Sequence, residues 1–198
     1  MTLPNQLTIL RIILSPVFLI LFLSDEPFLK QLSLLVFIVA ALSDWYDGWL
    51  ARKFNYITEW GKFMDPLADK VLTSCAFIGF VIIGLIELWM VAIIVIRDFT
   101  TTILRIYADR KGFVFTTSYY AKWKTLIQMV FLYYLLVVYI GSITPQLYNY
   151  FHSAFDILLN TQLIFFATLV VTIITLHTGI IYITKNKNVI KKIFSDET

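Results

Sequence analysis

Charged residues are scarce in this sequence. Asp, Glu, Lys and Arg together make up 15% of the 198 residues, whereas 59% of the residues are hydrophobic. A soluble globular domain has roughly a quarter charged and about half apolar residues, so this composition predicts an integral membrane protein. No internal repeat, long linker or low-complexity segment divides the chain. We therefore expect a single membrane domain over residues 1–198.

Cysteine is almost absent as well. Cys75 is the single cysteine, so the chain cannot form an internal disulfide, and its apolar neighbours favour a buried, inert thiol. The amino terminus lacks the basic leader and the small-residue cleavage site of a secretory signal. We therefore expect the first apolar segment to be retained as a membrane span.

Six segments are long and apolar enough to cross a bilayer, which takes about 20 residues per helix. They cover residues 7–23, 31–50, 67–86, 88–108, 124–140 and 157–183. The expected fold class is therefore all-α, an integral membrane bundle of six transmembrane helices. The segment 141–156 holds several aromatic residues and is expected to be a loop in the interfacial aromatic belt.

Lysine and arginine are unevenly distributed between these segments. They gather after the second, fourth and sixth segments, whereas the opposite connections hold only Lys30 among acidic residues. By the positive-inside rule, both termini and the stretch 44–69 are expected on the cytoplasmic side of the cell membrane. Membrane lipids are the expected surroundings, and no nucleic-acid partner is expected.

Four aspartates make the stretch 44–69 the centre of the predicted chemistry. Helical spacing puts them on shared faces with small residues. These faces hold Asp44, Asp47, Gly48 and Ala51 on one segment and Gly61, Asp65 and Asp69 on the next. An aspartate in the middle of a bilayer costs roughly 2.5–3.5 kcal/mol, so the group needs compensating charge. Carboxylates without nearby His or Cys favour Mg²⁺ or Mn²⁺ over zinc, and paired metals commonly serve displacement at phosphorus.

Single aspartates would also fit simpler structural roles. Asp65 precedes Pro66 and would serve as a helix N-cap with proline at the first helical position. Asp44 or Asp47 would also serve as a structural partner for Arg52. The shared cost of four acids near a membrane favours a common site over separate structural roles.

The same residues form a pattern, D-x-x-D-G-x-x-A-R, eight residues, then G-x-x-x-D-x-x-x-D, from Asp44 to Asp69. This pattern resembles the signature of the CDP-alcohol phosphotransferase family. The resemblance implies six transmembrane helices, usually a homodimer, and a site open to the cytoplasm. It also implies that an alcohol attacks the phosphorus of a CDP-linked lipid and that CMP leaves. The implied ligands of two divalent ions, Mg²⁺ or Mn²⁺, are Asp44, Asp47, Asp65 and Asp69, with Asp69 also acting as the base.

Two further segments resemble one branch of the family, the phosphatidylglycerophosphate synthases. They are the start, LPNQLTILRIILSPVF, and the region IRDFTTTILRIYADRKGF followed by AKWKTLIQM. This branch implies CDP-diacylglycerol and glycerol 3-phosphate as substrates. The residues implied to bind the CDP-lipid are Asn5, Thr8, Gly48, Ala51, Arg52 and Gly61. The residues implied to bind the acceptor phosphate are Arg97, Arg105 and Lys122.

Structural roles for the basic residues stay open at this point. Arg97 and Arg105 lie on nearly one face of an apolar segment, and Asp98 would neutralise Arg97 structurally. Arg110, Lys111 and Lys124 are interpreted as rim charges near lipid headgroups.

Two other functions also remain open. A cardiolipin synthase of the same family would use phosphatidylglycerol as acceptor. A cation transporter would use the aspartates for transport, but it predicts acids spread along a pathway rather than clustered.

Overall fold

The computed structural model describes residues 3–54, 58–113, 115 and 119–195, and every regular element in these ranges is an α-helix. The elements are α1 (Leu3–Leu23), α2 (Pro27–Phe54), α3 (Glu59–Ile82), α4 (Leu88–Arg110), α5 (Tyr119–Ser142), α6 (Pro145–Leu158), α7 (Thr161–Lys185) and α8 (Lys187–Ser195). The predicted all-α class is confirmed.

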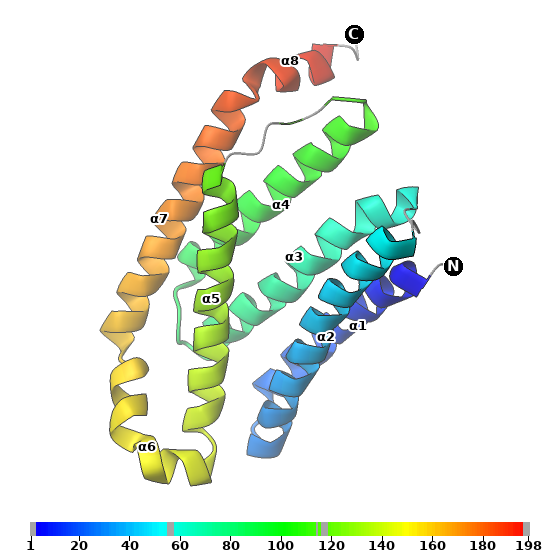
Figure 1. Ribbon diagram of the computed structural model, residues 1–198. Helices are drawn as coiled ribbons and strands as arrows, with labels where there is room; N and C mark the ends of the chain where they lie inside the picture. Colours follow the sequence, from blue (N-terminus) through cyan, green and yellow to red (C-terminus); the bar gives the residue numbers. More distant parts are fainter. Residues whose placement is uncertain (1–2, 55–57, 114, 116–118, 196–198) are drawn as a thin grey trace.

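The long helices run in alternating directions along the chain (Figure 1). Helix α1 packs mainly against α2 and α3, whereas α4 packs mainly against α7 and α3. The short helix α6 joins α5 to α7 at the lower end of the view, and α8 follows α7 at the opposite end (Figure 1). Helices α3 and α4 thus stand between the amino-terminal pair and the carboxy-terminal helices.

Four helical segments of the described chain are long and apolar enough to cross a membrane. They are Leu3–Leu23, Pro27–Leu50, Trp123–Ser142 and Thr161–Lys185. Helices α3 and α4 have similar lengths but each carries five charged residues, in the first half of α3 and from Arg97 to the end of α4. The chain is therefore a helical protein with several membrane-spanning candidates, and the count of six spans stays a prediction.

The core between α1, α3 and α5 is built from aromatic rings. The Phe22 ring centroid lies 5.1 Å from that of Phe80 and 5.4 Å from that of Tyr139. Gly79 makes this contact possible, because a Cβ atom there would come within 2.8 Å of Phe22 Cδ1. Cys75 packs against this core and is partly buried, so the expectation of a buried thiol is met in part.

Helix α3 begins earlier than the expected span at residue 67. Thr58 is its N-cap, and the Thr58 hydroxyl accepts a hydrogen bond from the Gly61 backbone N–H at 3.0 Å. Asp65 and Pro66 therefore lie inside the helix. The interpretation of Asp65 as a helix N-cap is wrong, because the capping position is already filled by the threonine.

The segment 141–156 is not a loop, because most of it belongs to α6. Pro145 stands at the start of that helix, where its missing N–H costs nothing. Tyr150 and Phe151 are 84% and 58% exposed, so the aromatic side chains do point outward as the belt interpretation requires. Asn160 then caps α7 by accepting from Gln162 N at 2.9 Å. The expected start of the sixth span at residue 157 is therefore too early, since α6 ends before α7 begins.

Candidate active site

The structure brings the four predicted aspartates into one region. Asp44 and Asp47 lie on neighbouring turns of α2, and Asp65 and Asp69 lie on neighbouring turns of α3. The carboxylates of Asp65 and Asp69 are close enough to Asp44 to interact with it electrostatically. Asp47 is buried, whereas the side chain of Asp44 is nearly half exposed. The aspartate cluster is therefore accessible to solvent at Asp44 and buried at Asp47.

Arg11 closes the buried side of this aspartate cluster. Its side chain is fully buried, and its Nη1 atom lies 2.5 Å from Asp44 Oδ1. The other terminal nitrogen, Nη2, donates to Asp47 Oδ2. One guanidinium from α1 thus joins two carboxylates of α2, as its fork of donors allows. The suggested partner Arg52 is therefore not needed to explain the burial of Asp47.

Residues from the start of α1 contact the α3 half of the cluster. The Thr8 hydroxyl donates to Asp65 Oδ1, and the Thr58 hydroxyl donates to Asn5 Oδ1 at 2.9 Å. A Cβ atom at Gly61 would come within 3.1 Å of the same Asn5 oxygen. Three residues predicted to bind the CDP-lipid, Asn5, Thr8 and Gly61, are thus placed beside the aspartates.

The remaining predicted lipid-site residues are placed less completely. Gly48 directly follows Asp47 on α2 and is partly buried. Ala51, Arg52 and Lys122 belong to helices, but their side chains lie outside the described part of the chain. Their predicted roles stay predictions.

The donor chemistry of the aspartate cluster fits Mg²⁺ or Mn²⁺. Carboxylate oxygens are the ligands that these hard cations prefer. In this structure Arg11 and Thr8 contact three of the four carboxylates. Within the described residues, no group of three or more acidic, His or Cys side chains is gathered tightly enough to hold a metal. Metal binding therefore requires some carboxylates to turn from their present partners.

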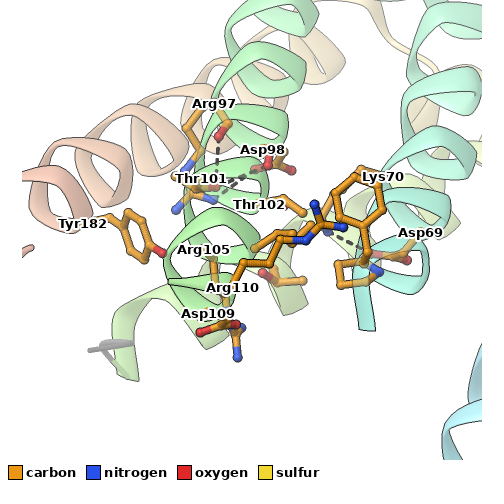
Figure 2. A pocket seen from close by; sticks show the side chains of 14 residues that line it. Asp69, Lys70, Arg97, Asp98, Thr101, Thr102, Arg105, Asp109, Arg110 and Tyr182 are labelled. Carbon is orange, nitrogen blue, oxygen red and sulfur yellow. Dashed lines mark hydrogen bonds and ion pairs between the residues drawn. The ribbon is translucent and has the colours of Figure 1, made fainter. Parts of the chain in front are cut away.

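A cavity of about 690 Å³ opens next to this cluster, between α3, α4, α5 and α7 (Figure 2). Its lining holds four cationic side chains, Lys70 of α3 and Arg97, Arg105 and Arg110 of α4, beside three acidic ones, Asp69, Asp98 and Asp109. The predicted phosphate-binding residues Arg97 and Arg105 therefore do line one cavity. Such a wall is suited to a small anion with several oxygens.

Asp69 belongs to both regions. Its carboxylate interacts with Asp44 on one side and lines the cationic cavity on the other (Figure 2). Lys70 Nζ lies 2.8 Å from Asp69 Oδ2. A carboxylate in this position can meet a hydroxyl group that arrives from the cavity and faces the aspartate cluster.

Asp98 also lines the cavity and is the acid at the centre of a group of largely buried polar side chains. Arg97 Nη1 lies 3.0 Å, and Lys124 Nζ 2.5 Å, from Asp98 Oδ1, while Gln128 Nε2 donates to Asp98 Oδ2 at 3.1 Å. Asp98 is 5% and Lys124 2% exposed. The suggested pairing of Arg97 with Asp98 is present. The interpretation of Lys124 as a rim charge is wrong, because the lysine is buried against a carboxylate from another helix.

Sequence reasoning missed the parts played by Arg11, Lys70 and Arg110. The Arg110 guanidinium lies 4.5 Å from the centre of the Phe63 ring, which holds it over the cavity. The sequence did hold a signal for Arg11, because a charged residue within an apolar segment requires a partner from another segment. It also held one for Lys70, which directly follows Asp69 and therefore lies close to the same site.

Comparison with known proteins identifies the family of this chain. Residues 1–175 match the sequence profile of the CDP-alcohol phosphatidyltransferase family. The chain therefore belongs to the CDP-alcohol phosphatidyltransferase family, and the predicted family resemblance is confirmed.

Several relatives within this family have named activities. The chain is 40% identical over 140 residues to a CDP-diacylglycerol–glycerol-3-phosphate 3-phosphatidyltransferase of Bacillus subtilis, covering 65% of this chain and 72% of the relative. It is 36% identical over 140 residues to the enzyme of the same name from Rickettsia typhi, covering 71% and 79%. It is 36% identical over 131 residues to a probable phosphatidylglycerophosphate synthase of Mycobacterium tuberculosis H37Rv, covering 65% and 62%.

Replacement of Asp98 by asparagine is expected to destabilise the fold strongly. The substitution leaves Lys124 buried without a counter-charge, and breaking a buried ion pair in this way typically costs about 3–5 kcal/mol. Thermal unfolding of the detergent-purified protein measures the loss as a lower midpoint. Asp156→Asn is the matched control, because Asp156 is exposed and its carboxylate accepts one long hydrogen bond, from Tyr148 Oη at 3.5 Å, among the described residues. Equal midpoints for the two variants would show that the Asp98 cluster contributes no net stability.

Proposed function

We propose that this protein transfers the phosphatidyl group of CDP-diacylglycerol to glycerol 3-phosphate, giving phosphatidylglycerol phosphate and CMP. The position of Asp69 carries the proposal, since it borders both the aspartate cluster and the cationic cavity. The names of the relatives from Bacillus subtilis and Rickettsia typhi support the same pair of substrates.

The cavity is the proposed acceptor site. A phosphate monoester is a dianion near neutral pH and needs several cationic donors, which a neutral alcohol does not. Arg97 and Arg105 line the cavity and are assigned to the acceptor phosphate, together with Lys122 on α5. Arg110 and Lys70 add positive charge to the same lining.

The aspartate cluster is the proposed site of the CDP-lipid. The residues assigned to that substrate are Asn5, Thr8, Gly48, Ala51, Arg52 and Gly61. The residues assigned to two divalent ions, Mg²⁺ or Mn²⁺, are Asp44, Asp47, Asp65 and Asp69. Such ions, when bound, neutralise charge on the pyrophosphate and on the leaving CMP.

The reaction itself is a displacement at phosphorus. Asp69 accepts the proton of the glycerol 3-phosphate hydroxyl as that oxygen attacks the phosphatidyl phosphorus. The bond between this phosphorus and the oxygen of CMP breaks, and CMP leaves with the bonding electrons. Cationic residues of the cavity hold the acceptor so that its hydroxyl faces Asp69. The attack then takes place between two bound reactants and is effectively unimolecular.

The proposed setting is the cell membrane, with six spans and both termini on the cytoplasmic side. The distribution of lysine and arginine supports this orientation. The first and last long helices begin and end, respectively, at the same side of the bundle, as such an orientation requires (Figure 1). A homodimer is proposed from the family resemblance.

Release of CMP by the purified protein tests the function directly. With CDP-diacylglycerol and Mg²⁺ or Mn²⁺, CMP release is expected with glycerol 3-phosphate and not with phosphatidylglycerol, inositol phosphate or serine. Chelation of the divalent ions should stop it. Release with phosphatidylglycerol instead would identify a cardiolipin synthase. No release with any acceptor, together with cation flux in liposomes, would favour a transporter.

Asp69→Asn is expected to abolish turnover while part of the CDP-lipid binding is retained. Asparagine preserves the size of the side chain but cannot take the proton. CMP release and binding of CDP-diacylglycerol are measured on the same preparation, with Asp156→Asn as a control for loss of a single negative charge. Normal turnover by the asparagine variant would rule out Asp69 as the base.

Arg105→Ala is expected to raise the KM for glycerol 3-phosphate by about tenfold or more, because a hydrogen bond to a charged group contributes roughly 1.5–3 kcal/mol. The KM for CDP-diacylglycerol should change much less. Lys185→Ala is a suitable control, since it removes one exposed positive charge that does not line the cavity. Equal effects of Arg105→Ala on both KM values would contradict the assignment of this arginine to the acceptor.

A further inference from the structure

Helix α7 shapes the cationic cavity from the side opposite α3, although its sequence shows little beyond hydropathy. The Thr178 hydroxyl accepts a hydrogen bond from Arg97 Nη2 at 3.1 Å. At Gly179 a Cβ atom would come within 3.0 Å of Arg97 Cγ, so the glycine leaves room for the arginine. One turn further along the helix, Tyr182 lines the cavity itself (Figure 2).

The position of Tyr182 is fixed by packing of its ring, whereas its hydroxyl makes no hydrogen bond to the described residues. Its side chain is 8% exposed, and its ring meets the edge of Phe115 with centroids 5.5 Å apart and planes at 80°. The ring also packs with Ala108 of α4. The hydroxyl is buried and has no hydrogen-bond partner among the described residues.

A buried hydroxyl without a partner is energetically costly and is uncommon in folded proteins. A hydroxyl kept in that state on the wall of a cavity is readily explained by a partner that the chain does not supply. The ring contacts fix where that partner must lie, because they leave the phenol little freedom to turn elsewhere.

The surroundings define the chemistry of this partner. Tyr182 is within electrostatic range of Arg105, Asp109 and Arg97. The two arginines have only donors and cannot accept from the phenol. Arg97 Nε is a second buried donor without a partner in the described chain. Asp109 is exposed at the last turn of α4 and makes no hydrogen bond with the phenol among those described.

A partner that satisfies these donors must bring acceptor oxygens, and the neighbouring Arg97 and Arg105 favour one that is negatively charged. The oxygens of a phosphate monoester have both properties. We infer that the Tyr182 hydroxyl donates a hydrogen bond to a phosphate oxygen of the acceptor held by Arg97 and Arg105, and thereby contributes to selection of a phosphorylated alcohol. This inference rests on the proposed function of the cavity. Tyr182 lies beyond residue 175, where the match to the family profile ends.

The test is Tyr182→Phe, which removes the hydroxyl and keeps the ring against Phe115. The KM for glycerol 3-phosphate should rise about tenfold or more, as expected for loss of a hydrogen bond to a charged group. The KM for CDP-diacylglycerol should stay within about twofold, because the phenol does not border the aspartate cluster. The inhibition constant of inorganic phosphate, competing with glycerol 3-phosphate, should rise by a similar factor. Tyr134→Phe is the matched control, because its hydroxyl donates to the Leu158 carbonyl at 2.6 Å and lies outside the cavity lining.

A binding measurement separates this inference from the proposed function. Inorganic phosphate should raise the midpoint of thermal unfolding of the unmodified protein more than that of Tyr182→Phe, whether or not turnover is observed. Without phosphate, the variant should unfold at the same or a higher temperature, since it no longer buries an unpaired hydroxyl.

The outcomes are distinct. An unmodified protein that uses glycerol 3-phosphate, with an unchanged KM in the variant, would overturn the inference and leave the proposed function standing. A raised KM with an unchanged inhibition constant for phosphate would also overturn it, because the hydroxyl would then contact another part of the acceptor. If the unmodified protein does not use glycerol 3-phosphate, the proposed function fails, and equal phosphate-induced shifts would overturn the inference as well.

Discussion

The contact of Arg11 with Asp44 and Asp47 is the interaction on which the amino-terminal half of the structure depends. Carboxylates in an apolar bundle are tolerated only with a compensating charge, and here one buried guanidinium serves two of them. The pairing ties α1 to α2 at the level of the site. It also fixes the start of α1, from which Thr8 reaches Asp65 on α3. Three helices are thus positioned by polar contacts at one end and by aromatic packing at the other.

A second set of charges positions the carboxy-terminal half. Asp98 draws Lys124 of α5 and Arg97 of α4 together, and Arg97 in turn reaches Thr178 of α7. The two sets differ in sign, because the first gathers acids around one cation and the second gathers cations around one acid. Asp69 stands where they meet. A site divided in this way suits the proposed reaction. The aspartates would bind one substrate through metal ions, and the basic side chains would bind the phosphate of the other.

The helices and the aspartate cluster could be predicted from the sequence because both rest on local information. Apolar length marks a helix, and carboxylates at helical spacing share a face wherever the helix lies. The partner of Asp47 could not be predicted, since Arg11 belongs to another helix and only packing brings them together. Lys124 was misjudged for the same reason: near the end of a span, a lysine that snorkels and a lysine buried on Asp98 have the same local sequence. Tyr182 gave no signal, because a tyrosine in an apolar helix becomes informative only when its hydroxyl is found without a partner.

The close contact at Gly179 joins α7 to Arg97 in the wall of the cavity proposed to bind the acceptor. With no side chain between them, the backbone of α7 rests directly on the stem of Arg97. A helix that crosses a bilayer adjusts its tilt to the thickness of the hydrocarbon layer. For α7 as a membrane span, a change in tilt would displace the guanidinium on the cavity wall, so that membrane thickness and affinity for the proposed acceptor would be coupled.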